Sequence, residues 1–179
     1  YLLILLGIDP GTVKCGYGII SKKENLRKCL GYGIINVPST LKMPDKLAFI
    51  YGEIDNIIRQ YRPEECAVET AFYGKNIQSA LKLGYARGTA IIAAVRAGLK
   101  ISEFSPKEVK KSVTGKGSAS KEQVGFMIKT LLNLGTVDIP LDASDALAIA
   151  LCASFQESSQ ATKPKSWSDF IKNNPDKVL

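Results

Sequence analysis

The sequence predicts one α/β domain over residues 1–156, built on a mixed five-stranded sheet flanked by helices. Two patterns predict it: short apolar runs typical of strands come first, and later runs of this kind alternate with amphipathic helical segments. In addition, 45% hydrophobic content over 179 residues is enough for one buried core. Residues 157–179, rich in Ser, Lys, Pro and Asn, are expected to form a loosely held C-terminal tail.

Three strands are expected to open the chain. Residues 2–8 form a continuous apolar run that stops before Pro10 and Gly11, which is typical of a strand buried on both faces. Shorter runs at 16–20 and 31–37 follow, separated by a polar turn at 22–25. The expected arrangement is three antiparallel strands.

A helix and a fourth strand should come next. The helix is predicted to end at Arg62-Pro63, and its apolar residues recur at helical spacing: Leu47, Ile50, Ile54, Ile57, Ile58 and Tyr61. Residues 66–69 then form a short apolar run. A helical crossover places such a strand parallel to the first one.

A second helix is predicted over about residues 76–97. Its apolar face would hold Ile77, Leu81, Gly84, Gly88, Ile91, Ile92 and Val95. Two glycines four residues apart on one face let another backbone approach closely, either in the same chain or in a partner chain.

The last third of the domain is expected to hold a fifth strand and three helices. Residues 100–104 read as the strand, and residues 106–113 as a helix with proline in its first turn. A loop at 115–118 precedes a helix over 120–132, and the final helix runs from 142 to 155.

Charge and cysteine content suggest the setting in which the protein works. Twenty-four Lys and Arg against seventeen Asp and Glu give a net charge of +7, which points to an anionic partner such as nucleic acid, although a merely soluble basic protein fits as well. The four cysteines form no C-x-x-C pair and lie in apolar stretches, as reduced core thiols do. The apolar start is too short for a membrane span of about 20 residues and lacks signal-peptide features, so we expect a cytoplasmic protein.

Four carboxylates are the most informative feature of the sequence. Asp9 and Glu69 follow apolar strand-like runs, and Asp142 and Asp145 lie three residues apart, on one face of the last predicted helix. Acids brought together in a partly buried pocket repel one another unless cations hold them. Because the chain has no histidine, the ligands would be all oxygen, which favours magnesium or manganese over zinc.

Two divalent ions roughly 3.5 to 4 Å apart are the arrangement that activates a water and stabilises the leaving oxygen in phosphodiester hydrolysis. The four acids therefore predict a metal-dependent hydrolase. Ordinary helix capping remains an open alternative for Asp142 and Asp145 taken as a pair.

Lysines form the second cluster, and they crowd the segment that holds Lys107, Lys110, Lys111, Lys116 and Lys121. Lys116 lies between two glycines just before a predicted helix, where backbone amides and a lysine can bind phosphate oxygens. For Lys107 and Lys111 we favour a solvated helix face. The loop has neither the upstream glycine nor the Gly-Lys-Ser/Thr order of a Walker A motif.

Phe72 follows Glu69 in a predicted loop that also holds Lys75. An exposed aromatic there could stack on unpaired bases, whereas a Phe buried under its loop would belong to the core. Melting of a Phe72→Ala variant separates the two, because truncating a core Phe costs about 3 to 5 kcal/mol.

With these residues in view, the chain resembles the RuvC family of Holliday-junction resolvases. The stretches that carry the resemblance run in family order from about residue 2 to 155: GIDPGT (7–12), GYG (16–18), VETAF (68–72), SALKLG (79–84), ARG (86–88), VK (109–110), GKGSA (115–119), Lys121 and DASDALA (142–148). These stretches form five motifs, within 7–18, 68–72, 79–88, 109–121 and 142–148, and five such motifs in order are very specific.

The resemblance implies an RNase H-like fold and a homodimer that makes paired nicks in four-way (Holliday) DNA junctions during recombination and repair. It implies Mg²⁺, two ions per active site with Mn²⁺ as a substitute, and RuvA and RuvB as partners. By position, the metal-binding catalytic acids would be Asp9, Glu69, Asp142 and Asp145, with Lys121 as a further catalytic residue. The DNA-binding residues would be Phe72, Lys75, Lys110 and Lys121. The helix holding Gly84 and Gly88 matches the dimer-forming helix.

Two other functions remain as alternatives. GIDPGT also resembles the first phosphate loop of actin-like sugar kinases and chaperone ATPases, which would make the chain a phosphotransferase fragment. Those folds need two such domains and a second glycine-rich loop, and the sequence offers neither. The other alternative is a non-catalytic DNA-binding module with an RNase H-like fold, for which missing acids would be the signature.

Overall fold

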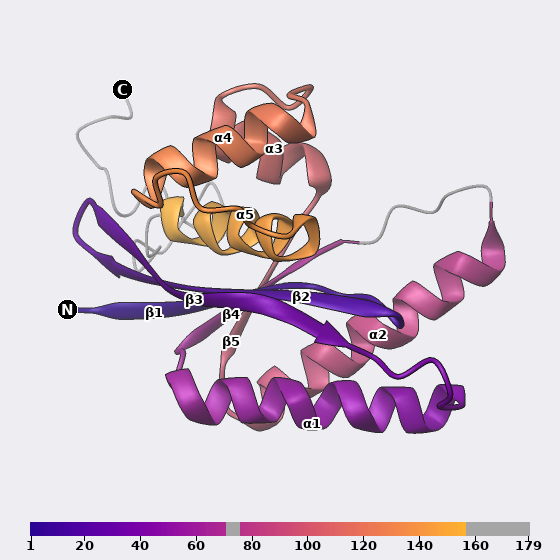
Figure 1. Ribbon diagram of the computed structural model, residues 1–179. Coiled ribbons are helices and arrows are strands. Elements are labelled where there is room, and N and C mark those ends of the chain that lie inside the picture. Colours follow the sequence, from indigo (N-terminus) through magenta and orange to yellow (C-terminus); the bar gives the residue numbers. More distant parts are fainter. Residues whose placement is uncertain (71–75, 157–179) are drawn as a thin grey trace, which may run out of the picture.

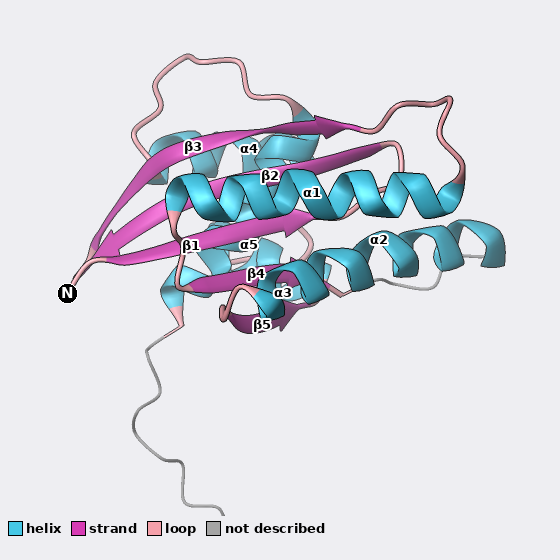
Figure 2. Cartoon of the chain, turned by 90° about the horizontal axis from the view of Figure 1, so that it is seen from below, coloured by secondary structure: helices cyan, strands magenta, loops and turns pink. Residues whose placement is uncertain are grey.

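The computed structural model describes residues 1–70 and 76–156. Within these residues, five strands form one mixed sheet in the order β3-β2-β1-β4-β5. Helices α1 and α2 cover one face of the sheet, and α3, α4 and α5 cover the other (Figures 1 and 2). The strands are β1 (Leu3–Asp9), β2 (Lys14–Lys23), β3 (Leu26–Asn36), β4 (Glu65–Glu69) and β5 (Lys100–Phe104). The helices are α1 (Met43–Tyr61), α2 (Ile77–Arg96), α3 (Pro106–Thr114), α4 (Lys121–Leu131) and α5 (Leu141–Phe155). The predicted fold class is confirmed.

The β2–β3 hairpin is longer than its apolar pattern predicted. Its ladder extends to the Lys23–Leu26 pair, so the turn is confined to Glu24 and Asn25. Glu24 adopts the left-handed conformation (φ 54°) that a tight hairpin turn requires. Cross-strand hydrogen bonds continue past the last buried side chain, which is why hydrophobicity alone underestimates the length of both strands.

The crossover from β1 to β4 has the predicted parallel direction. β1 pairs with β4 from Leu5–Glu65 through Ile8–Val68, so the carboxyl ends of the two strands lie side by side. Helix α1, which makes this crossover, ends where Arg62 turns to a left-handed conformation (φ 50°). The sheet therefore brings together the ends of two strands sixty residues apart in sequence.

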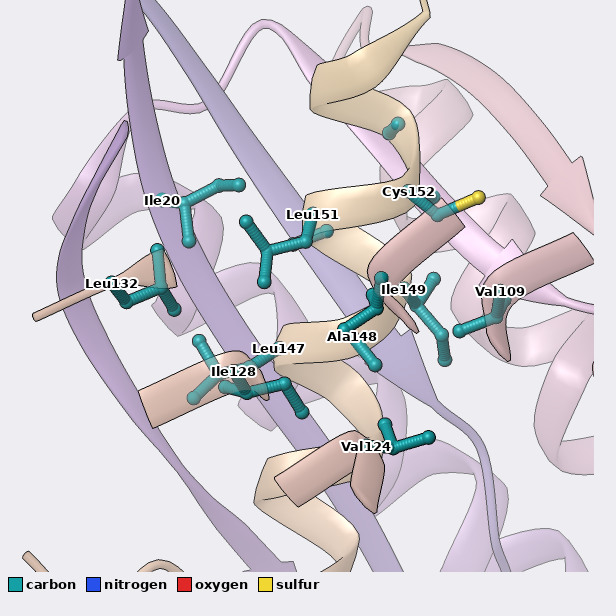
Figure 3. Packing of buried hydrophobic residues seen from close by; sticks show 14 of the residues in the cluster. Ile20, Val109, Val124, Ile128, Leu132, Leu147, Ala148, Ile149, Leu151 and Cys152 are labelled. Atoms are coloured by element: carbon teal, nitrogen blue, oxygen red, sulfur yellow. The ribbon is translucent and has the colours of Figure 1, made fainter. Parts of the chain in front are cut away.

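Helix α5 lies at the centre of one layer, between the sheet and helices α3 and α4 (Figure 1). Every residue from 146 to 154 is buried, as expected for a helix that is apolar on all sides. Figure 3 shows Leu147 and Leu151 of α5 among Ile128 of α4, Leu132 just after α4, and Ile20 of β2. Polar side chains on such a helix belong at its ends, and Asp142 and Asp145 lie at the first.

Three glycines let α5 approach the sheet closely: Gly7 on β1, and Gly16 and Gly18 on β2. We call them the glycine surface. A methyl group on Gly7 would lie 2.6 Å from the Ala150 backbone nitrogen, and one on Gly18 would lie 2.8 Å from the Leu147 nitrogen. A methyl group on Gly16 would overlap the backbone of Asp142. The strands thus contact the helix backbone directly, with no room for a side chain between them.

The far end of α5 is held by the β2–β3 hairpin. The Arg27 guanidinium donates hydrogen bonds to the Ser154 hydroxyl (2.8 Å) and carbonyl (3.1 Å) and lies over the Phe155 ring. Arg27 thus supplies the cation that α5 lacks in its own last turn.

Helix α2 leaves most of its predicted apolar face exposed and buries small residues against the rest of the chain. Its buried residues are the alanines Ala86, Ala90, Ala93 and Ala94. Small side chains let α2 lie close against α1 and the sheet, and its bulkier apolar residues are left exposed: Ile77, Leu81, Tyr85, Ile92 and Val95. Gly84 and Gly88 have open space where a side chain would be.

In the part of the chain that the structure describes, no helix is long and apolar enough to cross a membrane.

Candidate active site

Asp9 and Glu69 are the last residues of neighbouring parallel strands. Along each strand successive side chains alternate between the two faces, and the preceding residues Ile8 and Val68 pack in the core on the α1–α2 side. The two carboxylates therefore project from the opposite face, where α5 lies. Just beyond Glu69, Thr70 donates backbone and side-chain hydrogen bonds to the Phe104 carbonyl (2.8 and 3.2 Å), which fixes the end of β4.

Asp142 and Asp145 lie in the first two turns of α5, as predicted. Helix capping does not account for them, because the N-cap residue is Pro140 and no side-chain hydrogen bond caps this end of the helix. Instead, the Asp142 backbone lies over Gly16, which pairs with Asp9 across the β1–β2 ladder. The glycine surface thus places the acidic end of α5 beside the acidic ends of the strands.

The pKa values of Asp9 and Glu69 are both raised, and neighbouring carboxylates contribute to each shift. Burial, together with the charges of Asp145, Glu69 and Asp142, raises the pKa of Asp9 from 3.8 to about 7. Burial and the charge of Asp145 also raise the pKa of Glu69. Each of the three other acids raises the pKa of Asp9 by more than Lys121 lowers it.

Lys121 is in direct contact with this cluster. Its ammonium nitrogen lies 3.2 Å from an Asp145 carboxylate oxygen, and this hydrogen bond raises the pKa of the lysine. Lys110 is close enough to Glu69 for its charge to oppose the rise in the Glu69 pKa, whereas Lys111 on the same helix is exposed. This contrast favours the predicted division between an active-site lysine and a solvated one.

The donor set suits a hard divalent cation, because all four side chains offer carboxylate oxygens and their repulsion is relieved by positive charge. Among the described residues, no three acidic side chains are already arranged as a metal-binding cluster. The carboxylate of Asp145 instead forms an ion pair with Lys121. The carboxylate oxygens and their mutual repulsion therefore both suit a bound divalent metal ion.

Several predicted residues lie outside the described part of the chain. Phe72 and Lys75 fall within residues 71–75, and the predicted tail falls within 157–179. Their roles stay predictions. In contrast, sequence reasoning missed the glycine surface as the feature that positions the site. The signal was present: Gly16 and Gly18 are two residues apart and hence lie on one face of a strand.

Comparison with known proteins points to one family. Residues 5–153 match the family described as crossover junction endodeoxyribonuclease RuvC. A protein of that name from Chloroherpeton thalassium is 45% identical over 99% of this chain and 100% of its own length. Another from Citrifermentans bemidjiense is 53% identical over 84% of this chain and 91% of its own length.

Solved structures agree in fold. Thermus thermophilus RuvC in complex with a Holliday junction substrate superposes with a TM-score of 0.80 at 30% identity, covering 86% of this chain and 93% of that one. The yeast mitochondrial Holliday junction resolvase Ydc2 has a TM-score of 0.60 at 18% identity, covering 84% of this chain and 75% of its own. At that identity the yeast protein supports the fold alone.

Proposed function

Since this chain belongs to the RuvC family of crossover junction endodeoxyribonucleases, we propose that it resolves four-way DNA junctions with the acid cluster at the N-terminal end of α5. The observation that carries this assignment of the site is that Glu69, Asp142 and Asp145 lie close enough to Asp9 for their charges to add to burial in raising its pKa. The phosphotransferase alternative finds no support, since the family match spans most of the chain.

The four acids would hold divalent metal, and we propose Mg²⁺, with two ions per site and Mn²⁺ as a substitute. Bound metal supplies charge neutralisation at the phosphate and a water of lowered pKa. The chain's own residues do the rest: β1, β4 and α5 fix the carboxylates, and Lys121 lies where it can offset charge that develops on the scissile phosphate. Lys110 and exposed lysines of the same segment would attract the DNA backbone without reading its sequence.

One experiment tests both the reaction and the metal. Purified protein is incubated with a synthetic four-way junction in Mg²⁺, Mn²⁺, Ca²⁺ or chelator, and the strands are scored for symmetric nicks. We expect cleavage in Mg²⁺ and Mn²⁺, and binding without cleavage in Ca²⁺, which binds oxygens at longer and more variable distances than Mg²⁺. Cleavage in Ca²⁺ or chelator at the Mg²⁺ rate would refute the metal role, and the absence of any nicks would refute the proposed reaction.

Lys121→Ala should slow cleavage by about 100-fold, the lower end of what one preorganised transition-state donor contributes, and should weaken binding much less. Lys110→Ala should also slow cleavage more than it weakens binding, since the charge of Lys110 acts on Glu69 and opposes the rise in its pKa. The matched control is Lys111→Ala, on the same helix but exposed. Rates and affinities are compared at one salt concentration, because phosphate contacts weaken steeply with ionic strength. Equal small effects of all three substitutions would mean that the segment acts only as a basic surface and that neither Lys110 nor Lys121 acts in cleavage.

We also propose that two copies pair through the exposed face of α2. Its large apolar side chains lie in one stripe along the helix, and Gly84 and Gly88 leave room there for another backbone. A second copy covering this stripe would bury apolar surface that the single chain leaves in water.

A charge on this stripe should separate the copies. Ile92→Glu is expected to leave the fold of each chain intact, since Ile92 is exposed, yet to shift sedimentation from dimer to monomer and uncouple the two nicks. Leu30→Glu, at an exposed apolar residue of the edge strand β3, is the control. A dimer that persists in both Ile92→Glu and Leu81→Glu would place the interface elsewhere.

RuvA and RuvB stay predicted partners, and joint sedimentation of all three proteins on a four-way junction would test them. The four cysteines are unpaired, which supports the predicted location in the reducing cytoplasm. Fractionation of cells that express the protein would test this location.

A further inference from the structure

A hollow of about 440 Å³ lies between the end of α3, the following loop and α4. We call it the α3–α4 hollow. Its apolar wall is made by Ala119, Phe126 and Met127, and its polar rim includes Lys116 and Glu122. The volume falls in the range of roughly 300 to 1,000 Å³ typical of small-ligand sites.

Two features of the hollow suggest what it could bind. Phe126 is 69% exposed, so a flat aromatic face is open to a ligand. Lys116 is held through its backbone: its N–H donates to the Thr114 hydroxyl (3.1 Å) and its carbonyl accepts from Ala119 N–H (3.2 Å). Among the described residues, Lys116 forms no ion pair. An aromatic face and a lysine that line the same hollow match the base and the phosphate of one nucleotide.

Charge and position favour DNA over a protein segment. Residues 106–131 carry six lysines against two glutamates, a surplus that attracts a polyanion. Helix α4 contributes to both the hollow and the acid cluster, since Glu122 lines the hollow and the preceding residue, Lys121, contacts Asp145 through its ammonium group. A DNA strand lying across the acids would pass the rim of the hollow.

Resting on the proposed junction-cutting function, we propose that the α3–α4 hollow binds one unpaired nucleotide of the junction, with its base stacked on Phe126 and its phosphate at Lys116. This contact is separate from the acids and from the lysine that touches them. It would help hold the opened centre of the junction beside the acids.

The test uses substitutions that leave the acid cluster intact. Junction affinity in Ca²⁺ is measured across a salt series for wild type, Phe126→Ala, Phe126→Trp and Lys116→Ala. We expect Phe126→Ala to bind about 5-fold more weakly or worse, because base stacking on an aromatic ring is worth at least that factor. Its salt dependence should match wild type, and Phe126→Trp should bind as wild type does. Lys116→Ala should weaken binding and reduce the salt slope by about 1, as loss of one phosphate contact predicts.

The control is Leu26→Ala, another exposed large apolar residue (57% exposed), located in the hairpin that holds the opposite end of α5. It should bind like wild type. Phe126→Ala binding like Leu26→Ala, or Lys116→Ala with an unchanged salt slope, would overturn the proposal. Melting temperatures are measured for all variants, and values equal to that of wild type exclude an effect of a substitution through folding.

A second arm does not depend on junction cutting. A short single-stranded oligonucleotide containing 2-aminopurine should change fluorescence when it binds wild type, and Phe126→Ala should abolish that change. If wild type fails to cut junctions yet shows this signal, the proposed function fails and the nucleotide site stands. If wild type cuts junctions and both variants match the control, the nucleotide site fails alone.

Discussion

Asp9→Asn is expected to abolish junction cleavage while leaving junction binding near wild type. The substitution removes one ligand charge from the proposed metal site and leaves the lysines of α3 and α4 untouched. A loss of about 100-fold or more is expected, since even groups that only support metal ligands are worth roughly 10- to 100-fold. Cleavage is measured on a synthetic junction in Mg²⁺, and binding is measured in Ca²⁺.

The same variant should be at least as stable as wild type without metal. The pKa of Asp9 is raised from 3.8 to about 7 in the folded protein, so its ionised form opposes folding. This penalty is absent below pH 4, grows as the pH rises toward 7, and is complete above it. Metal-free wild type should therefore show a larger fall in melting temperature between pH 4 and pH 8 than Asp9→Asn does.

For the cleavage prediction, near wild-type nicking by Asp9→Asn would remove Asp9 from the mechanism.

Gly16→Ala is expected to damage both stability and cleavage. The added methyl group would overlap the Asp142 backbone, which cannot rotate away as a side chain would. Overpacking usually costs about 1 to 3 kcal/mol, and this contact with a helix backbone should reach the upper end or exceed it. Relief requires the start of α5 to move off the sheet, which separates Asp142 from Asp9. Thermal unfolding and cleavage per folded molecule measure the two effects.

Gly52→Ala is the matched control, because Gly52 lies within α1 and a methyl group there meets nothing within 4 Å. It should be neutral or stabilise the protein by up to about 1 kcal/mol, since alanine is the better helix former. If Gly16→Ala unfolds like Gly52→Ala and retains full activity, α5 does not depend on the close contact described above.

The sequence predicted much of the fold because its apolar runs are long and sharply bounded. The run at residues 2–8 stops at Pro10, and Arg62-Pro63 ends α1, so both elements could be placed from local signals. Asp9 and Glu69 were predicted to be neighbours because parallel strands bring their carboxyl ends to the same edge. The proximity of Asp9 and Glu69 followed from topology, whereas that of Asp142 and Asp145 depended on where the last helix packs.

Three features needed three-dimensional information. The burial of alanines on α2 could not be predicted from the spacing of its bulky residues, because the short distance between α2 and its neighbours, set by the packing, selects alanine. The role of Gly16 depends on a helix more than one hundred residues later. The Lys121–Asp145 contact depends on how α4 packs against α5, which periodicity does not specify.

The packing of α5 on β1 and β2 also has a consequence for synthesis. The last helix of the described domain completes a centre whose first acid is at position 9, so a chain halted on the ribosome before residue 141 carries only two of the four acids. Such a nascent chain can form its N-terminal hairpins, but it cannot close a centre that spans 136 positions from Asp9 to Asp145. With the proposed catalytic role of the four acids, phosphodiester cleavage would become available only when translation of the domain is nearly complete, and unfinished chains would be harmless to DNA.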